Sequence, residues 1–262
     1  MKCSVWVDQQ FTRARELVNY ELCEKKMEKK PNPGKCIHCL RWHKELTWDH
    51  VFPKAWYPTT TSAELYKWQV PSCRECHRIY GKLEEELLIR LALCVDPADP
   101  RCAGIVEKGL RAIDPRHGKD EKDARARLAK RHQILRESFR GENIPLQAAY
   151  PNFGKHEHIP IEEQMAVTIK EESVRKLSEK IVKGIFYLED GQFIQSPYHI
   201  DFFVLHDESA APIMDMLEKY GTVHAREPGI VVSRVVAPED STSSFFCIEI
   251  WGRFKMYAAV TD

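Results

Sequence analysis

Apolar residues recur at helical spacing in one part of this chain and gather in short runs in another. A stripe of five apolar residues between positions 83 and 95 predicts a helix with one face in the core. This helix should end at the proline-rich segment 96–100. Apolar and aromatic runs near the C-terminus are typical of strands. The stripe consists of Leu83, Leu87, Leu88, Leu91 and Val95, and the runs lie at 198–205, 230–236, 245–251 and 254–260.

Further helices are predicted where amphipathic or charged stretches are bounded by turn-forming residues. These stretches lie at 8–30, at 125–140 (rich in arginine and followed by Gly141), at 162–183 and at 210–220. The segment 143–160 contains three prolines and a glycine, which favours a loop, and we place a domain boundary there. The sequence therefore predicts an α+β protein with an N-terminal part, residues 1–142, and a C-terminal part, residues 143–262. The C-terminal part should hold a small, mostly antiparallel sheet.

Charge is divided unevenly along the chain, although 39 Lys and Arg residues balance 39 Asp and Glu residues. Residues 1–140 hold 28 Lys and Arg against 20 Asp and Glu, a balance of +8, and residues 141–262 hold 11 against 19, a balance of −8. The basic half fits a nucleic-acid partner, because Lys and Arg dominate contacts with the phosphate backbone. The arginine-rich stretch at 125–140 is equally well explained as a solvated helix face.

Nine cysteines occur in the chain, no apolar run reaches membrane-spanning length, and the first residues lead us to expect no leader peptide. An odd number of cysteines without a leader peptide favours a reducing compartment, so we expect a cytoplasmic protein that has no membrane partner. Five of the cysteines show no metal-ligand spacing and are most simply buried or free thiols. They are Cys3, Cys23, Cys94, Cys102 and Cys247.

The other four cysteines form two Cys-x-x-Cys pairs, Cys36 with Cys39 and Cys73 with Cys76. Each pair can chelate an ion from a tight turn, so the four thiolates can complete a tetrahedral Zn²⁺ site. Such a site is coordinatively full, and its zinc would be structural. Any chemistry must therefore come from residues that this zinc module, at about 33–90, holds in place.

Three ionisable residues are the nearest candidates: Asp49 and His50 between the pairs, and His77 directly after the second pair. His50 suits a general base because the unperturbed pKa of histidine lies near neutrality. Asp49 is a hard oxygen ligand suited to Mg²⁺, and His77 would add a nitrogen ligand from the first turn of the following helix. Nitrogen ligation also suits Mn²⁺, so the sequence predicts a catalytic Mg²⁺ or Mn²⁺ besides the structural zinc.

The stretch 46–53, Leu-Thr-Trp-Asp-His-Val-Phe-Pro, together with the two cysteine pairs and Cys-His at 76–77, resembles the HNH (ββα-metal) endonucleases with a four-cysteine zinc. The resemblance implies a treble-clef-like module with flanking helices. It also implies phosphodiester hydrolysis in DNA, with RNA not excluded, in which His50 activates water, Asp49 and His77 hold the metal, and a 5′-phosphate end results. Arg74, Arg78 and Lys82 would contact the nucleic acid.

The sequence departs from the family at one position, because no Asn lies between Asp49 and Cys73 to orient the catalytic histidine. Glu64 is the nearest polar candidate for that role, although a carboxylate cannot donate a hydrogen bond as an amide does. Asp49 and His50 are also adjacent, and adjacent strand residues point to opposite faces, so both can serve one site only near a strand end or a distortion.

Each candidate also has a plainer interpretation. His38 and His43 are most simply solvated turn residues, His77 could cap a helix, and the three basic residues could form an exposed polar face. The alternative to a nuclease is a non-catalytic zinc-binding module that contacts nucleic acid or protein. The C-terminal part carries no motif for catalysis, so we expect it to support a homodimer or a regulatory partner.

Overall fold

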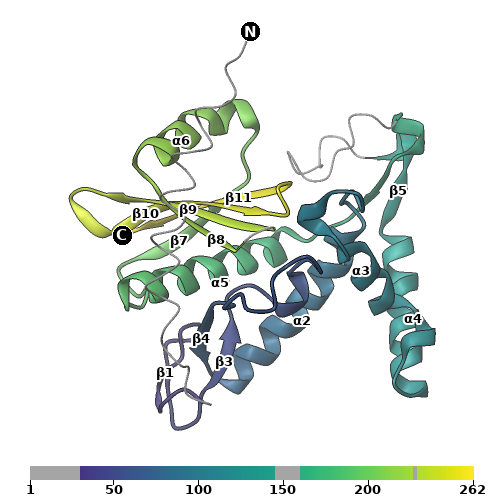
Figure 1. Cartoon of the computed structure of the whole chain (residues 1–262), viewed down its shortest axis with the longest axis horizontal. Helices are drawn as coiled ribbons and strands as arrows, with labels where there is room; N and C mark the ends of the chain where they lie inside the picture. Colours follow the sequence, from purple (N-terminus) through teal and green to yellow (C-terminus); the bar gives the residue numbers. More distant parts are fainter. Residues whose placement is uncertain (1–29, 145–159, 227–228) are drawn as a thin grey trace.

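The computed structural model describes residues 30–144, 160–226 and 229–262 of the chain. Within these ranges it contains five α-helices and four small sheets, in all of which the paired strands are antiparallel (Figure 1). The predicted α+β class is therefore confirmed, and the treble-clef arrangement stays a prediction. All but the last residue of the helix expected at 8–30, as well as Cys3 and most of the loop expected at 143–160, lie outside the described residues.

The first part of the structure is a pair of short hairpins followed by a long helix. Strands β1 (Gly34–Lys35) and β2 (Trp42–His43) form the first hairpin, and β3 (Thr47–His50) and β4 (Gln69–Ser72) form the second. Helix α2 (Arg74–Ala92) follows β4 directly. We call β3, β4 and α2 the hairpin–helix unit. The side chain of Cys73 accepts a hydrogen bond from the backbone N–H of Cys76 and so caps α2.

Two further helices, α3 (Ile105–Ile113) and α4 (Glu121–Arg136), follow α2. The arginine-rich helix thus ends before 140, because 138–140 form strand β5 (Ser138–Arg140), which pairs with β6 (Met165–Val167). The same pairing explains why no helix begins at 162, where one was predicted. Short 3-10 helices lie at Lys54–Trp56, Pro100–Cys102, Pro115–His117, Gly141–Asn143 and Ile161–Glu163.

A five-stranded sheet forms the last part of the structure, with strand order β7-β11-β10-β9-β8. Helix α5 (Glu171–Asp190) lies against one face and α6 (Asp207–Tyr220) against the other (Figure 1). Side chains alternate accordingly along β10, where Phe246 and Ile248 join the core around α5 and Cys247 joins the core around α6. The strands are β7 (His199–Phe203), β8 (Thr222–Arg226), β9 (Ile230–Ala237), β10 (Asp240–Ile250) and β11 (Phe254–Thr261).

Helix α5 packs between the sheet and the hairpin–helix unit, contacting β7 and β11 on one side and β4 and α2 on the other (Figure 1). One continuous core therefore includes residues from both sides of 143. The Trp251 indole N–H donates to the Trp56 carbonyl across 2.8 Å. At Gly184 of α5 the approach is so close that an added Cβ would lie 2.6 Å from a methyl carbon of Val51.

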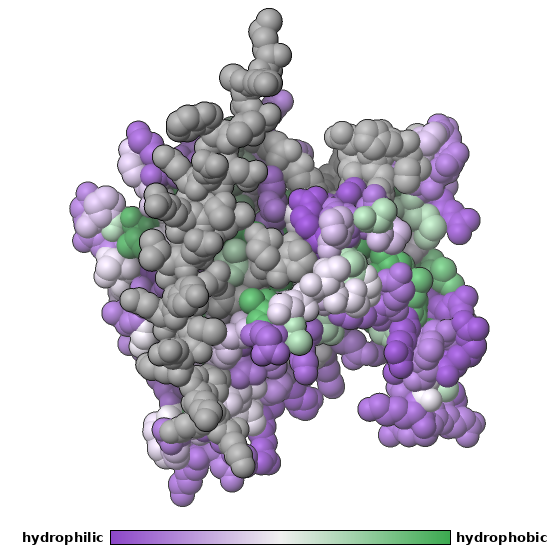
Figure 2. All heavy atoms as spheres, in the orientation of Figure 1, coloured by the Kyte–Doolittle hydropathy of each residue, from purple (hydrophilic) through white to green (hydrophobic). Residues whose placement is uncertain are grey.

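The surface is mainly hydrophilic in the view of Figure 2, most evidently over α4, whose described side chains are exposed or half-buried except for Ile134. Among the described helices, none is both long enough and apolar enough to cross a bilayer.

Candidate functional site

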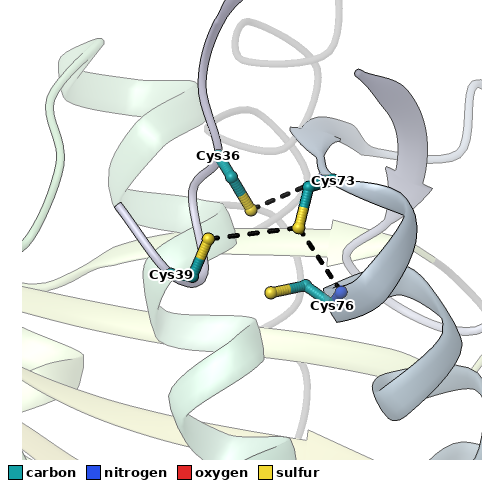
Figure 3. A group of neighbouring side chains, drawn as sticks. All are labelled: Cys36, Cys39, Cys73 and Cys76. Atoms are coloured by element: carbon teal, nitrogen blue, oxygen red, sulfur yellow. Dashed lines mark hydrogen bonds between the residues drawn. The ribbon is translucent and has the colours of Figure 1, made fainter. Parts of the chain in front are cut away.

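The four paired cysteines come together as one cluster. Cys36 and Cys39 lie on the turn after β1, and Cys73 and Cys76 lie at the start of α2, with their side chains directed toward one another (Figure 3). All four Sγ atoms lie within 4.8 Å of one another. Two thiolates bound to one Zn²⁺ at about 2.3 Å in tetrahedral geometry are about 3.8 Å apart, so the cluster could hold an ion such as zinc.

Hydrogen bonds to sulfur support this cluster. The backbone N–H of Cys73 donates to Cys36 Sγ across 3.3 Å, and His43 Nε2 lies 3.6 Å from Cys39 Sγ. Burial opposes the Cys36 thiolate, but N–H groups of the neighbouring backbone outweigh burial and lower the pKa of Cys36. Burial and the other sulfur atoms raise the pKa of Cys76. A bound cation would relieve the repulsion that prevents four thiolates from coexisting.

The hairpin beside this cluster carries two of the predicted catalytic residues, Asp49 and His50, at the end of β3. Asp49 pairs with Val70 across the hairpin and His50 pairs with Gln69. Asp49 is 3% exposed, whereas His50 is half-buried. This difference follows from the alternation of side chains along a strand.

The third predicted residue, His77, faces Asp49 from the first turn of α2. Its Nε2 atom lies 3.9 Å from Asp49 Oδ1. Thr47 fixes the ring, because its hydroxyl donates to the Ser72 carbonyl across 3.1 Å and lies 3.1 Å from His77 Nδ1. A hydroxyl has a single proton, so the Thr47 oxygen accepts from Nδ1–H, and the lone pair of a neutral His77 ring lies on Nε2, toward Asp49.

The positions of Asp49 and His77 fit a shared metal ion. Ligand bonds of about 2.0–2.2 Å allow two donor atoms of one ion to be no more than roughly 4.3 Å apart. The 3.9 Å between Asp49 Oδ1 and His77 Nε2 lies within that limit. Metal-binding histidines commonly donate their second ring N–H to a neighbouring oxygen, as His77 does to Thr47.

His50 has a side-chain amide as its partner. Gln69 Nε2 lies 2.9 Å from His50 Nε2, so the amide N–H donates to the ring in this arrangement. Rotating the amide by half a turn would present its oxygen instead and leave Nδ1 of His50 free to accept a proton. Burial lowers the pKa of His50, which keeps the ring in the neutral form that a general base requires.

Both oxygens of Asp49 have protein partners. His38 Nε2 lies 3.1 Å from Oδ2, and Lys180 Nζ lies 3.2 Å from Oδ1. Burial would raise the pKa of Asp49, but the His38 hydrogen bond and the Lys180 charge outweigh it and hold that pKa below its usual value. His38 is therefore not the solvated turn residue that the sequence predicted. It is buried, and its ring centroid lies 4.5 Å from that of Tyr80.

Lys180 comes from α5, far along the chain, and is completely buried. It also forms an ion pair with Glu84 of α2, and its Nζ lies 5.6 Å from the centroid of the Tyr80 ring. Burial raises the pKa of Glu84 to about 7, even though Lys180 partly offsets the shift. Asp49, Glu84 and Lys180 thus form a buried charged cluster next to His77.

The remaining predicted residues lie on the outside of the unit. Arg74, Arg78 and Lys82 are exposed at successive turns of α2, and Arg74 Nη2 lies 3.1 Å from Glu45 Oε2. Glu64 is also exposed, and its backbone N–H donates to the Ser62 hydroxyl. In the described residues the side-chain amide next to His50 is that of Gln69.

Four residues of this site were not predicted from the sequence, and the sequence signals for them differ. Gln69 follows from the hairpin register once β3 and β4 are paired. Lys180 lies between Leu177 and Gly184, which are four residues or fewer away on the buried face of α5. A lysine on a buried helix face indicates a buried ion pair, although the neighbouring residues in the sequence do not identify its partners. The four residues are His38, Gln69, Glu84 and Lys180.

Comparison of the chain with protein-family models, with curated proteins and with solved structures gave no match.

Proposed function

We propose that this protein is a metal-dependent nuclease of the HNH type that hydrolyses phosphodiester bonds in DNA, with a structural zinc on Cys36, Cys39, Cys73 and Cys76. The observation that carries the proposal is the pairing of Asp49 Oδ1 with His77 Nε2 at 3.9 Å, next to His50 on a hairpin braced by four cysteines. Asp49 and His77 would hold a divalent cation such as Mg²⁺ or Mn²⁺. That cation would supply a Lewis acid for phosphate oxygens and for the leaving group.

His50 would act as the general base. Its ring is kept neutral by burial, and Gln69 holds it at the strand end. With the Gln69 amide oxygen accepting from Nε2–H, Nδ1 of His50 can take a proton from an attacking water molecule. Gln69 thus supplies the side-chain amide that the family places between its two histidine positions, although it comes from the partner strand.

The basic face of α2 would bind the phosphate backbone. Arg74, Arg78 and Lys82 are spaced four residues apart, so their exposed side chains follow one side of the helix that also carries His77. Contacts of this kind position a duplex without reading its sequence. The excess of eight positive charges in residues 1–140 supports the same partner.

Incubation of the zinc-loaded protein with plasmid DNA tests this function. Cleavage should require Mg²⁺ or Mn²⁺ and should stop with EDTA. His50→Ala should abolish it, and His77→Ala should raise the metal concentration that cleavage needs. His199→Ala, on an exposed residue of the distant sheet, is the matched control and should cleave as the unaltered protein does. Unchanged turnover in both site variants would exclude this site as the catalytic centre.

A second function, that of a non-catalytic zinc-dependent nucleic-acid-binding protein, is favoured by one observation. Both oxygens of Asp49 are already paired, with His38 and with Lys180, so the carboxylate has a protein partner on each side. In that case DNA should bind equally well with and without Mn²⁺, and no cleavage should occur. Gel-shift and cleavage assays on the same samples separate the two functions.

A further inference from the structure

We propose that Lys180 is a built-in cation of the Asp49 site, and that a divalent ion must displace its ammonium group before it can bind there. This inference rests on the proposed function, because it concerns the metal that Asp49 and His77 would hold. It assigns to α5 of the C-terminal part a direct role in the occupancy of the nuclease site.

The ammonium group of Lys180 contacts the oxygen of Asp49 that would bind the metal ion. Lys180 Nζ lies 3.2 Å from Asp49 Oδ1, and this is the same oxygen that lies 3.9 Å from His77 Nε2. A divalent ion about 2.1 Å from Oδ1 would lie no more than roughly 5.3 Å from the ammonium. At that distance the two positive charges repel strongly, since Lys180 is fully buried and water screens the pair little.

The ammonium group also has a second carboxylate partner. Glu84 of α2 already forms an ion pair with Lys180. The four-carbon side chain of lysine is flexible, and Nζ is already in full contact with Glu84, so it can swing away from Asp49 while remaining paired with Glu84. Displacement therefore requires no unpaired charge and no unfolding of α5.

Without a divalent ion, the charge of Asp49 is balanced by protein groups alone. Asp49 is 3% exposed, and a buried carboxylate without a partner is strongly unfavourable. Lys180 and His38 supply that partnership in the resting protein. The same contacts that keep Asp49 ionised and the fold stable must reduce the affinity of the site for metal.

Binding of Mn²⁺ to the full, zinc-loaded chain tests the proposal, with free Mn²⁺ measured by electron paramagnetic resonance. Lys180→Met should lower the Mn²⁺ dissociation constant at least about tenfold. Lys176→Met, one turn away on α5 and exposed, is the matched control and should leave the constant unchanged. Asp49→Asn should remove the site, which identifies the ion counted. Zinc content and thermal melting establish that each variant is folded.

The double variant Lys180→Met with Glu84→Gln guards against two complications. It removes one positive and one negative charge together, so it preserves the charge balance of the cluster if Lys180→Met alone does not fold. It also prevents a released Glu84 from serving as a new metal ligand. The double variant should bind Mn²⁺ more tightly than the unaltered protein.

The outcomes separate this inference from the function on which it rests. Tighter Mn²⁺ binding in Lys180→Met and the double variant supports the proposal. Equal or weaker binding in both, with loss of binding in Asp49→Asn, overturns the role of Lys180 and leaves the metal site standing. If neither the unaltered protein nor the two Lys180 variants binds Mn²⁺, the metal site itself is wrong, and the proposal is wrong with it.

Discussion

Gly184 is the position at which the contact between α5 and the β3–β4 hairpin can be tested most directly. A Cβ at this residue would lie 2.6 and 2.7 Å from the two γ-carbons of Val51, the residue that follows His50. Both values are about 1 Å shorter than ordinary carbon contacts. Val51 is fully buried and β-branched, so it cannot rotate away freely. Gly184→Ala should therefore push α5 and the hairpin apart.

Helix propensity and overpacking have opposite effects on the free energy of unfolding of Gly184→Ala. Ala in a helix interior is more stable than Gly by roughly 1 kcal/mol. Overpacking of a filled core costs about 1–3 kcal/mol. The net expectation for Gly184→Ala is a loss of up to about 2 kcal/mol, which lowers the melting temperature by at most roughly 4–8 °C in a protein of this size. Under the proposed function the cleavage rate should also fall, because the displaced residue is next to His50.

The control is Gly81→Ala in α2, where an added Cβ meets nothing within 4 Å. This change should stabilise the protein by up to about 1 kcal/mol, since only the helix term remains. A double-mutant cycle with Val51→Ala isolates the clash, because the shortened side chain leaves room for the new methyl group. Thermal or urea unfolding of the zinc-loaded proteins provides the values. Stabilisation by Gly184→Ala equal to that of Gly81→Ala, or simple additivity in the cycle, would refute the close contact.

Three further predictions concern the site, and a fourth concerns the other described cysteines. Cys73→Ser should lose zinc and destabilise the hairpin–helix unit, as elemental analysis and melting would reveal. His50→Ala should lower the cleavage rate by about 10²–10⁴-fold without changing zinc content. The pKa of Glu84 rises from 4.5 in the unfolded chain to about 7 in the folded chain, so between these pH values only the folded chain keeps the proton. The free energy of unfolding should therefore fall as the pH rises from 4.5 to about 7. Glu84→Gln should remove up to about 3 kcal/mol of that fall, measured as the difference between the two proteins. Cys94, Cys102 and Cys247, whose pKa values burial raises to about 11, 11 and 12, should resist alkylation at pH 8 until the protein unfolds, as mass spectrometry would detect.

Local sequence patterns correctly predicted those helices and strands in which the spacing of apolar residues matches the face that is buried in the fold. The apolar stripe from Leu83 to Val95 lies on α2 and its continuation, and the runs at 230–236, 245–251 and 254–260 lie on β9, β10 and β11. In each case the period of the apolar residues matches the face that is buried. Spacing alone likewise predicted the four-cysteine cluster, because two Cys-x-x-Cys turns are self-contained chelating units.

The errors arise where distant residues decide the structure. Residues 165–167 were predicted to be helical, but they pair with 138–140, more than twenty residues earlier, and α5 begins only at Glu171. Strand β8 and helix α3 were not predicted. The partners of Lys180 lie 131 and 96 residues away, at Asp49 and Glu84, so no local pattern identifies them. His38 was assigned to solvent because its contact with Asp49 depends on the folded hairpin.

The charge division at residue 140 does not coincide with a division of the core. The basic half carries the cysteine cluster, His50 and His77, yet the helix that packs on Val51 and neutralises Asp49 comes from the acidic half. Separating the halves would expose the buried face of α5 and leave Asp49 without its lysine. Removal of one partner from a buried charge pair costs several kcal/mol. The basic half by itself would therefore need another cation beside Asp49, and under the proposed function a divalent metal ion held by Asp49 and His77 would supply that charge.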